Sequence, residues 1–267
     1  MVGGTGLLGR ALCRIAPPSA AATHCSSPPV AGVSTWHHID LRDGGTDGAA
    51  LVDELRPDTV VNAAYVASGP DLDAITARAP GALAAACARV GARFVHVSTD
   101  VVFDGTTDRP YREDDPVSPP HDYGRAKADA EAAVADADPG AVIVRTSLLY
   151  GDTDDPGHQA AMVTDPSMRF FDDEYRCPLA VTSLAHACLE LAERRDIAGP
   201  LHVAGADIVD RHEFARRLAP LVGVDAAAVV GAPGPADGSR PRNCPLDTSR
   251  ARSLLTTPLP GVREILR

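Results

Sequence analysis

The sequence predicts an α/β fold, namely a doubly wound parallel sheet followed by a small C-terminal α+β lobe. Two observations lead to this prediction. Short apolar segments alternate with helical segments over residues 1–150, which is typical of repeated βα units on a parallel sheet. After Gly151 the alternation loosens and Asp and Pro become frequent, which predicts a smaller lobe at the strand ends, where such sheets bind ligands.

Each expected element follows from apolar periodicity and from the Pro and Gly residues that interrupt it. We expect strands over residues 20–25, 34–41, 59–63, 94–98, 141–146 and 201–204. We expect helices over residues 7–15, 49–55, 80–90, 123–136 and 184–194. The division that follows is a nucleotide-binding domain over 1–150, to which 178–205 return, and a substrate lobe made of 151–177 and 206–267.

Charge and composition exclude several classes of protein. The formal net charge is −11 and there is no basic tract, which argues against nucleic acid or an anionic membrane surface as partner. No apolar run approaches the roughly 18 residues that span a bilayer. The six cysteines form no CxxC pair and the nine histidines show no ligand spacing. We therefore expect a cytoplasmic protein with reduced thiols and no metal site.

The chain opens with a glycine-rich turn in which Gly3, Gly6 and Gly9 are spaced as G-x-x-G-x-x-G. In a βα unit the first glycine allows the tight turn, the second lets the backbone approach a pyrophosphate, and the third lets helix pack on sheet. Only Met1 and Val2 precede the turn. We therefore expect the native chain to begin several residues earlier, and the alternative is a flexible glycine-rich terminus.

Residues at the next strand ends bear on the choice of dinucleotide. Asp40 ends the expected strand 34–41 and could accept a hydrogen bond from an adenine amino group, or it could simply terminate the strand in an Asp turn. Cys25-Ser26-Ser27 stand where an acid would bind the ribose 2′-hydroxyl. Arg10 directly follows the third glycine and could meet a 2′-phosphate, so this pattern favours NADPH over NADH.

A tyrosine and a lysine share one face of the expected helix 123–136. Tyr123 and Lys127 are spaced i, i+4. A phenol has a pKa of about 10, and a neighbouring cation lowers that value and makes the phenol a usable proton donor. Lys127 is the only lysine among 25 lysine and arginine residues. The alternative is an ordinary exposed pair on a helix.

Hydroxyl groups stand at the carboxyl end of the expected strand 94–98. Thr99 or Ser98 could donate a hydrogen bond to the carbonyl oxygen of a substrate. The alternative is a strand end satisfied by its own Ser/Thr turn.

Seven motifs follow one another along the chain, namely GGTGLLG, VVNAA, HVSTDVVFDG, YGRAK, VRTSLLYG, DDEYRCPLAVTSLA and RPRNCPLDTS. In this order they resemble the extended short-chain dehydrogenase/reductase superfamily, in particular its dTDP-4-dehydrorhamnose reductase (RmlD-like) branch. The resemblance covers almost the whole chain. It implies a Rossmann-type domain that binds NADP or NAD and a small lobe that holds a nucleotide-sugar.

The resemblance also implies an activity and roles for individual residues. It implies a cytoplasmic NAD(P)H-dependent oxidoreductase that reduces a nucleotide-linked 4-keto-deoxysugar. A homodimer is a possible assembly of such an enzyme. The implied catalytic residues are Thr99, Tyr123 and Lys127. Implied cofactor contacts are Gly3, Thr5, Gly6, Leu7, Leu8, Gly9, Arg10, Ser26, Asp40, Leu41, Asn62, Ala63, Ala64, Ser98, Tyr123 and Lys127, and implied substrate contacts are Thr99, Val101, Phe103, Leu148 and Arg240.

The sequence departs from the branch at specific positions. Leu148 stands where an aromatic residue is usual, Ala77-Arg78 replace an Asn, and the region after Gly151 is short and acidic. These departures concern the identity of the sugar. Val101 follows Asp100 where related sugar dehydratases carry a second acid, which disfavours dehydration. Arg240 and Arg242 could contact substrate phosphates or could be solvated surface residues.

Two other functions fit the same motifs. Some relatives resemble regulatory subunits of methionine adenosyltransferase, which bind a dinucleotide without turning it over. An epimerase of the same superfamily would use the same three residues with no net consumption of cofactor.

Overall fold

The computed structural model describes residues 1–267, which fold as two compact units. Unit 1 comprises Met1–Thr99, Asp122–Val144 and Ala185–Leu201, and unit 2 comprises Asp100–His121, Arg145–Leu184 and His202–Arg267. The domain boundary expected near residue 150 stays a prediction.

Unit 1 contains the parallel sheet. Its four central strands lie in the order β10 (Gly199–His202), β5 (Val142–Thr146), β4 (Arg93–Thr99) and β3 (Thr59–Asn62). Strands β1 (Ala21–His24) and β2 (Thr35–His38) form a second parallel pair. The predicted Rossmann-type α/β class is confirmed.

Met1 and Val2 connect these two groups of strands. The Val2 N–H donates to the carbonyl of Val61 at 2.9 Å, and the Ala63 N–H donates to that of Val2 at 3.0 Å. On the other side, the Thr23 N–H donates to the carbonyl of Met1 at 2.9 Å. Two residues therefore occupy the place of a central strand between β1 and β3, directly before the glycine-rich turn.

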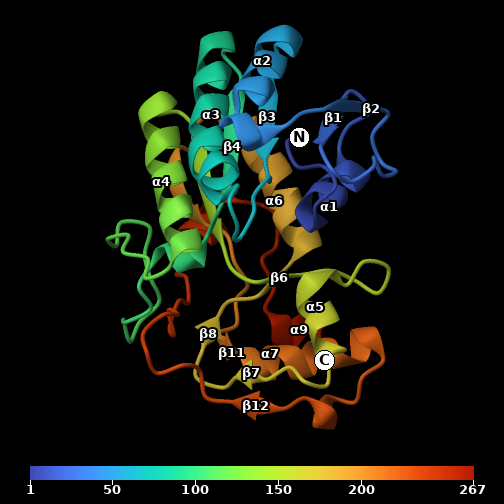
Figure 1. Ribbon diagram of the computed structural model, residues 1–267, viewed down its shortest axis with the longest axis vertical. Helices are drawn as coiled ribbons and strands as arrows, with labels where there is room; N and C mark the ends of the chain where they lie inside the picture. The colour runs from blue at the N-terminus through green and yellow to red at the C-terminus, as the bar shows by residue number, and fades with distance from the viewer. The chain divides into compact units, whose positions relative to one another are not determined.

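Helices α2 (Thr46–Leu55), α3 (Ala79–Val90) and α4 (Asp122–Ala137) pack beside one another over one face of this sheet, as Figure 1 shows. Their buried side chains share one apolar core with strands β3, β4 and β5, which includes Val60, Leu83, Phe94 and Ile143. Helices α1 (Leu7–Ile15) and α6 (Val181–Glu193) lie on the other side of the strands in the same view. The sheet is thus covered on both faces, as its apolar strands require.

The elements expected in unit 1 are present, with ends that differ by a few residues. Helix α1 has the predicted bounds, whereas the strand expected over 34–41 ends at His38. Asp40 then accepts a hydrogen bond from the Arg42 N–H and caps a short 3₁₀ turn, Leu41–Asp43. The capping carboxylate favours the 3₁₀ turn over a longer strand, because it accepts from a backbone N–H in the first residues of the turn.

Unit 2 is built from short strands and helices. Strands β6 (Leu149–Tyr150) and β9 (Leu179–Ala180) pair in parallel, as do β7 (Phe170–Phe171) and β12 (Gly231–Ala232). Strands β8 (Tyr175–Arg176) and β11 (Val209–Asp210) are antiparallel. The helices are α5 (Gly157–Val163), α7 (Arg211–Leu218), α8 (Ser249–Leu254) and α9 (Val262–Ile265). A separate apolar core, with Tyr150, Phe170 and Phe214, holds most of them together.

Candidate active site

The three glycines of the opening turn meet different surroundings. Gly3 has a φ of +84°, and a Cβ on it would lie 2.8 Å from the Ala64 nitrogen. A Cβ on Gly9 would lie 2.1 Å from the Gly3 carbonyl oxygen. A Cβ on Gly6 would have the Gly3 oxygen, at 3.5 Å, as its only neighbour within 4 Å. Gly3 and Gly9 are therefore required by the fold, whereas Gly6 borders open space.

The open space at Gly6 suits a phosphate group. Helix α1 begins at Leu7, and no side chain caps its first N–H groups. Free N–H groups at a helix N-terminus attract anions through hydrogen bonds and the helix dipole. A dinucleotide pyrophosphate therefore fits this turn.

A cavity of about 390 Å³ extends from the turn along the ends of β1, β2 and β3. This volume is in the range of small-molecule sites. Eight of the expected cofactor residues line it, namely Gly3, Thr5, Gly6, Ser26, Asp40, Leu41, Ala63 and Ala64. The ten other lining residues were not among the expected cofactor contacts; they are Val2, Thr23, His24, Cys25, Ile39, Arg42, Tyr65, Val66, Asp71 and Ile75.

Other expected cofactor residues do not line this cavity. Arg10 turns back onto the loop, where its Nη1 donates to the Thr5 carbonyl oxygen at 2.5 Å. Asn62 is buried beside His96, with 3.2 Å between Asn62 Nδ2 and His96 Nδ1, and its Oδ1 accepts from the Ala64 N–H. Leu7, Leu8, Gly9 and Ser98 are also outside the lining. Asn62 thus shapes the strand end that the cavity uses.

The pair Asp40 and Arg42 forms one rim of the cavity. Arg42 Nη2 and Nε contact the Asp40 carboxylate at 2.5 Å and 2.9 Å. These hydrogen bonds lower the pKa of Asp40 to about 2. A fixed negative charge and an exposed guanidinium therefore stand together where β2 ends.

Tyr123 and Lys127 both lie on α4 in unit 1. Lys127 is only 3% exposed, and its Nζ donates to the Val97 carbonyl oxygen at 2.8 Å. Burial lowers the pKa of Lys127 to about 8, against the opposing effect of the Glu131 carboxylate one turn further along α4. Tyr123 is half-buried at the start of the helix, and Thr99 is the half-buried last residue of β4. The helix and the strand thus carry a phenol, an ammonium and a hydroxyl within one unit.

The ring of Tyr65 lies against both members of the pair. Its centroid is 5.8 Å from that of Tyr123 and 5.5 Å from Lys127 Nζ. Tyr65 also lines the cavity. A side chain that follows β3 thereby connects the cavity to the residues on α4, although no motif in the sequence marks it.

The expected substrate residues other than Thr99 lie in unit 2. Phe103 is fully buried and stacks on Tyr111 with 4.1 Å between ring centroids. The Cζ atom of the Arg145 guanidinium lies over the Phe103 ring, 5.1 Å from its centroid. These contacts give Phe103 a packing role. Val101 and Leu148 are half-buried, and Leu148 packs against the core of unit 2.

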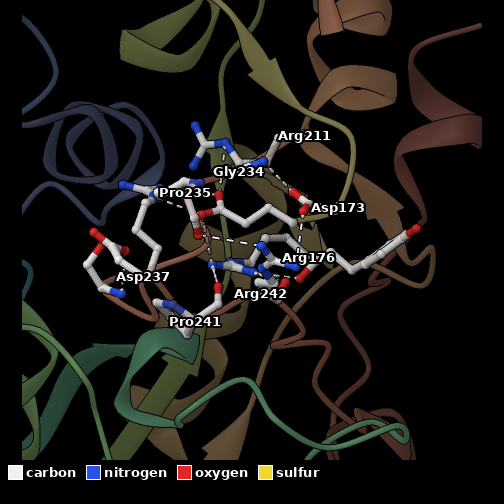
Figure 2. A network of polar contacts seen from close by, with 12 residues as sticks. Asp173, Arg176, Arg211, Gly234, Pro235, Asp237, Pro241 and Arg242 are labelled. Carbon is white, nitrogen blue, oxygen red and sulfur yellow. Dashed lines mark hydrogen bonds and ion pairs between the residues drawn. The ribbon is translucent and has the colours of Figure 1, made fainter. Parts of the chain in front are cut away.

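Arg240 belongs to a network of charges around the buried Glu174. Arg240 Nε donates to Glu174 Oε1 at 2.6 Å, and Arg211 Nε lies 3.5 Å from Oε2. Arg176 Nη2 donates to the Pro241 carbonyl oxygen at 2.7 Å. Figure 2 shows Asp173, Arg176 and Arg211 beside Gly234, Pro235 and Pro241 of the loop 234–242. An ion pair at 3.3 Å joins Arg242 of this loop to Asp173. Both Arg240 and Arg242 thus pair with carboxylates of their own unit.

No group of three or more His, Cys, Asp or Glu side chains has the arrangement of a metal site. None of the helices combines the length and the apolar character that crossing a membrane requires.

Comparison with known protein families shows the family of this chain. The family model described as RmlD substrate binding domain matches residues 1–267. A probable low-salt glycan biosynthesis reductase, Agl14, of Haloferax volcanii is 34% identical over 249 residues, covering 86% of this chain and 82% of that protein. The dTDP-4-dehydrorhamnose reductase of Mycolicibacterium smegmatis is 35% identical over 203 residues, which cover 73% of this chain and 62% of the relative.

A different kind of protein matches as well. Methionine adenosyltransferase 2 subunit beta of Pongo abelii is 34% identical over 220 residues, which cover 75% of this chain and 62% of the relative. Among solved structures, a dTDP-4-dehydrorhamnose reductase from Clostridium acetobutylicum has a TM-score of 0.80 at 25% identity, covering 98% of this chain and 94% of the other. The enzyme from Bacillus anthracis in complex with NADP has a TM-score of 0.80 at 22% identity, with coverages of 99% and 95%, and supports the fold alone.

Proposed function

The chain belongs to the RmlD substrate binding domain family, and from this premise we propose that it is an NAD(P)H-dependent reductase of a nucleotide-linked 4-keto-deoxysugar. The observation that carries the proposal is the pair Tyr123 and Lys127 on α4, whose lysine is buried and held by the Val97 carbonyl. The relatives named as reductases support the same activity.

In this proposal the cofactor, when bound, would supply a hydride for the carbonyl carbon of the sugar. Tyr123 donates its phenolic proton to the carbonyl oxygen as charge develops there. The Lys127 ammonium lowers the pKa of that phenol, because a nearby cation stabilises the phenolate. The Thr99 hydroxyl donates a hydrogen bond to the same oxygen and stabilises the transition state.

We propose that the cavity of unit 1 holds the adenosine and pyrophosphate parts of the cofactor. The turn at Gly6 and the free N–H groups of α1 would hold the pyrophosphate, and Asp40 and Leu41 would border the adenine. No acid follows β1, where Cys25 and Ser26 line the cavity, and the Arg42 guanidinium stands on the rim. The lack of a carboxylate directly after β1 favours NADPH, because no negative charge there would repel a 2′-phosphate. Arg42, which is paired with Asp40 on the rim, is the nearest cation that such a phosphate could share.

The test is a panel of nucleotide-linked 4-keto-deoxysugars, each incubated with NADPH or NADH while the nicotinamide absorbance is followed. We expect consumption of the cofactor with at least one sugar, faster at low NADPH than at equally low NADH. No consumption with any sugar would contradict the reductase. Interconversion of sugars without loss of absorbance would indicate an epimerase.

A second candidate function is that of a regulatory subunit that binds the dinucleotide without turning it over. The 34% identity to methionine adenosyltransferase 2 subunit beta favours it. Tight NADPH binding by calorimetry, together with co-purification of a methionine adenosyltransferase and an inert keto-sugar panel, would support this function. Turnover of any keto-sugar would favour the reductase.

A further inference from the structure

Tyr65 is the one aromatic side chain whose ring is in contact with both Tyr123 and Lys127 among the ring contacts of unit 1. Resting on the proposed reductase function, we propose that Tyr65 is a positioning residue that holds the Lys127 ammonium under its ring face and keeps the Tyr123 ring in line with the cofactor cavity. It would act through these two residues and would transfer no proton itself.

The position of the Lys127 ammonium explains why a ring is needed there. The Lys127 side chain is almost fully buried, and Nζ has one backbone acceptor, the Val97 carbonyl at 2.8 Å. An ammonium taken out of water needs further stabilisation. The face of an aromatic ring within about 6 Å supplies it through the ring quadrupole, and Tyr65 lies at 5.5 Å.

The charged and titratable groups around Lys127 come from three elements. On α4 they are Tyr123 and Glu131, whose carboxylate also accepts from Ser98 Oγ at 2.5 Å. On β4 the group is His96, which is fully buried and whose pKa burial and Lys127 lower well below its usual value. After β3 it is Tyr65. Only the Tyr65 ring combines contact with the ammonium and with the phenol.

The position of Tyr65 in the cavity wall connects its contact with Lys127 to the proposed cofactor site. Tyr65 is 56% exposed and lines the cavity between Ala64 and Val66. A residue whose purpose is packing would be buried, whereas this ring borders the space proposed for the cofactor. A bound cofactor would cover the exposed part of the ring and remove more water from Lys127.

The single lysine of the chain makes a direct test available. Protein labelled with ¹³C at lysine Cε gives one lysine signal, which reports the ionisation of Lys127 in the full chain without substrate. In the wild type we expect a pKa of about 8. Tyr65→Leu keeps apolar cover but removes the ring, so the pKa of Lys127 should fall by about half a unit. Tyr65→Phe keeps the ring and should retain the wild-type pKa.

Two controls make the result specific. Tyr175→Leu, at a similarly exposed tyrosine on β8 in unit 2, should leave the pKa of Lys127 unchanged. Thermal unfolding should give the same midpoint for the Tyr65 variants as for the wild type within a few degrees. An unchanged pKa in Tyr65→Leu, a raised one, or an equal shift in Tyr65→Phe would overturn the proposal.

The kinetic arm separates this inference from the proposed function. If a keto-sugar is turned over, kcat should be measured as a function of pH. The pH at which kcat falls on the alkaline side should be lower by the same half unit in Tyr65→Leu and unchanged in Tyr65→Phe. A change in KM alone, with the pH dependence of kcat unchanged, would contradict the positioning role. If no sugar is turned over, the proposed reductase fails, and the lysine signal still decides whether Tyr65 holds Lys127.

Discussion

The phenol of Tyr123 is the proton donor in the proposed reaction. Tyr123→Phe removes one hydroxyl from a half-buried ring and leaves its contact with Tyr65 in place. We expect kcat to fall by about 10²-fold or more, the usual contribution of a general acid, with the affinity for NADPH within a few-fold of the wild type. Stopped-flow reduction and fluorescence titration would measure the two quantities. A variant that kept full turnover would disprove the assigned role.

Lys127 is retained at a cost to stability, because burial disfavours its charged form. Its pKa is about 8 in the folded chain against 10.5 as the ordinary value. Between these values the unfolded chain binds more protons, so the free energy of unfolding rises with pH, by up to about 3 kcal/mol from this group. At pH 7 the full penalty is present.

Replacing the lysine should therefore raise stability while it abolishes activity. We expect Lys127→Met to unfold at a higher urea concentration than the wild type at pH 7, because its free energy of unfolding should be about 1 to 3 kcal/mol larger. This difference in free energy should shrink as the pH rises from 8 to 10.5. Urea titrations of both proteins at several pH values provide the measurement. A variant that was less stable at pH 7 would show that the contacts of the ammonium with Val97, Tyr65 and Glu131 outweigh its burial.

Two glycines of the turn before helix α1 should respond differently to substitution, Gly9 through stability and Gly6 through ligand binding. Gly9→Ala would place a Cβ 2.1 Å from the Gly3 carbonyl oxygen, so the turn must deform. We expect a loss of several kcal/mol in stability, in the range of severe overpacking. Gly6→Ala has room in the free protein, so its midpoint should stay within a few degrees.

The expected loss in Gly6→Ala is instead in affinity for NADPH. The added methyl group would occupy the space proposed for the pyrophosphate, so we expect binding to weaken by at least about 10-fold, equivalent to about 1.4 kcal/mol. Calorimetric titration with NADPH measures this affinity. Because the φ of Gly6 is −72°, alanine at this position adds no backbone strain that could account for a loss. Equal affinity in Gly6→Ala and the wild type would contradict the placement of the pyrophosphate.

The loop 234–242 is held by the charges around Glu174. Removing the carboxylate would leave Arg176, Arg211 and Arg240 facing one another in a largely buried place. We expect Glu174→Gln to destabilise unit 2 by about 3 to 5 kcal/mol, the usual effect of breaking a buried ion pair on one side. Asp237→Asn, in the exposed part of the same loop, is the matched control and should have little effect. Thermal unfolding of the two variants compares them, and equal midpoints would show that the network adds nothing to stability.

At the level of the whole molecule, the chain passes between the two units several times. Residues 100–121 belong to unit 2, 122–144 return to unit 1, and α6 begins in unit 2 and continues in unit 1. The proposed catalytic residues and the cavity all lie in unit 1, whereas most residues expected to contact the sugar lie in unit 2. In the proposed function, unit 1 therefore binds the cofactor and carries the catalytic residues, whereas unit 2 supplies most contacts to the sugar. Each unit is built from segments that are not consecutive in the sequence.

The parts that could be predicted from the sequence depend on local physics. The bounds of α1 follow from the Gly turn before it and Pro17 after it, and the strands of the central sheet follow from continuous apolar runs such as residues 59–63. The spacing of Tyr123 and Lys127 places them on one helix face without knowledge of any other element. The short central strand could not be recognised, because its two residues are defined by partners on β1 and β3.

The sequence by itself determined the α/β class, the glycine turn and the helix that carries Tyr123 and Lys127, because each depends on residues within a few positions of one another. Only the tertiary structure decided that Arg42 and Tyr65 border the cavity, that Phe103 belongs to a core and that Arg240 is paired with Glu174. These facts depend on contacts between residues far apart in the sequence, such as Glu174 and Arg240, which are 66 positions apart. Periodicity and spacing carry no information about such contacts, because they arise when separate elements pack.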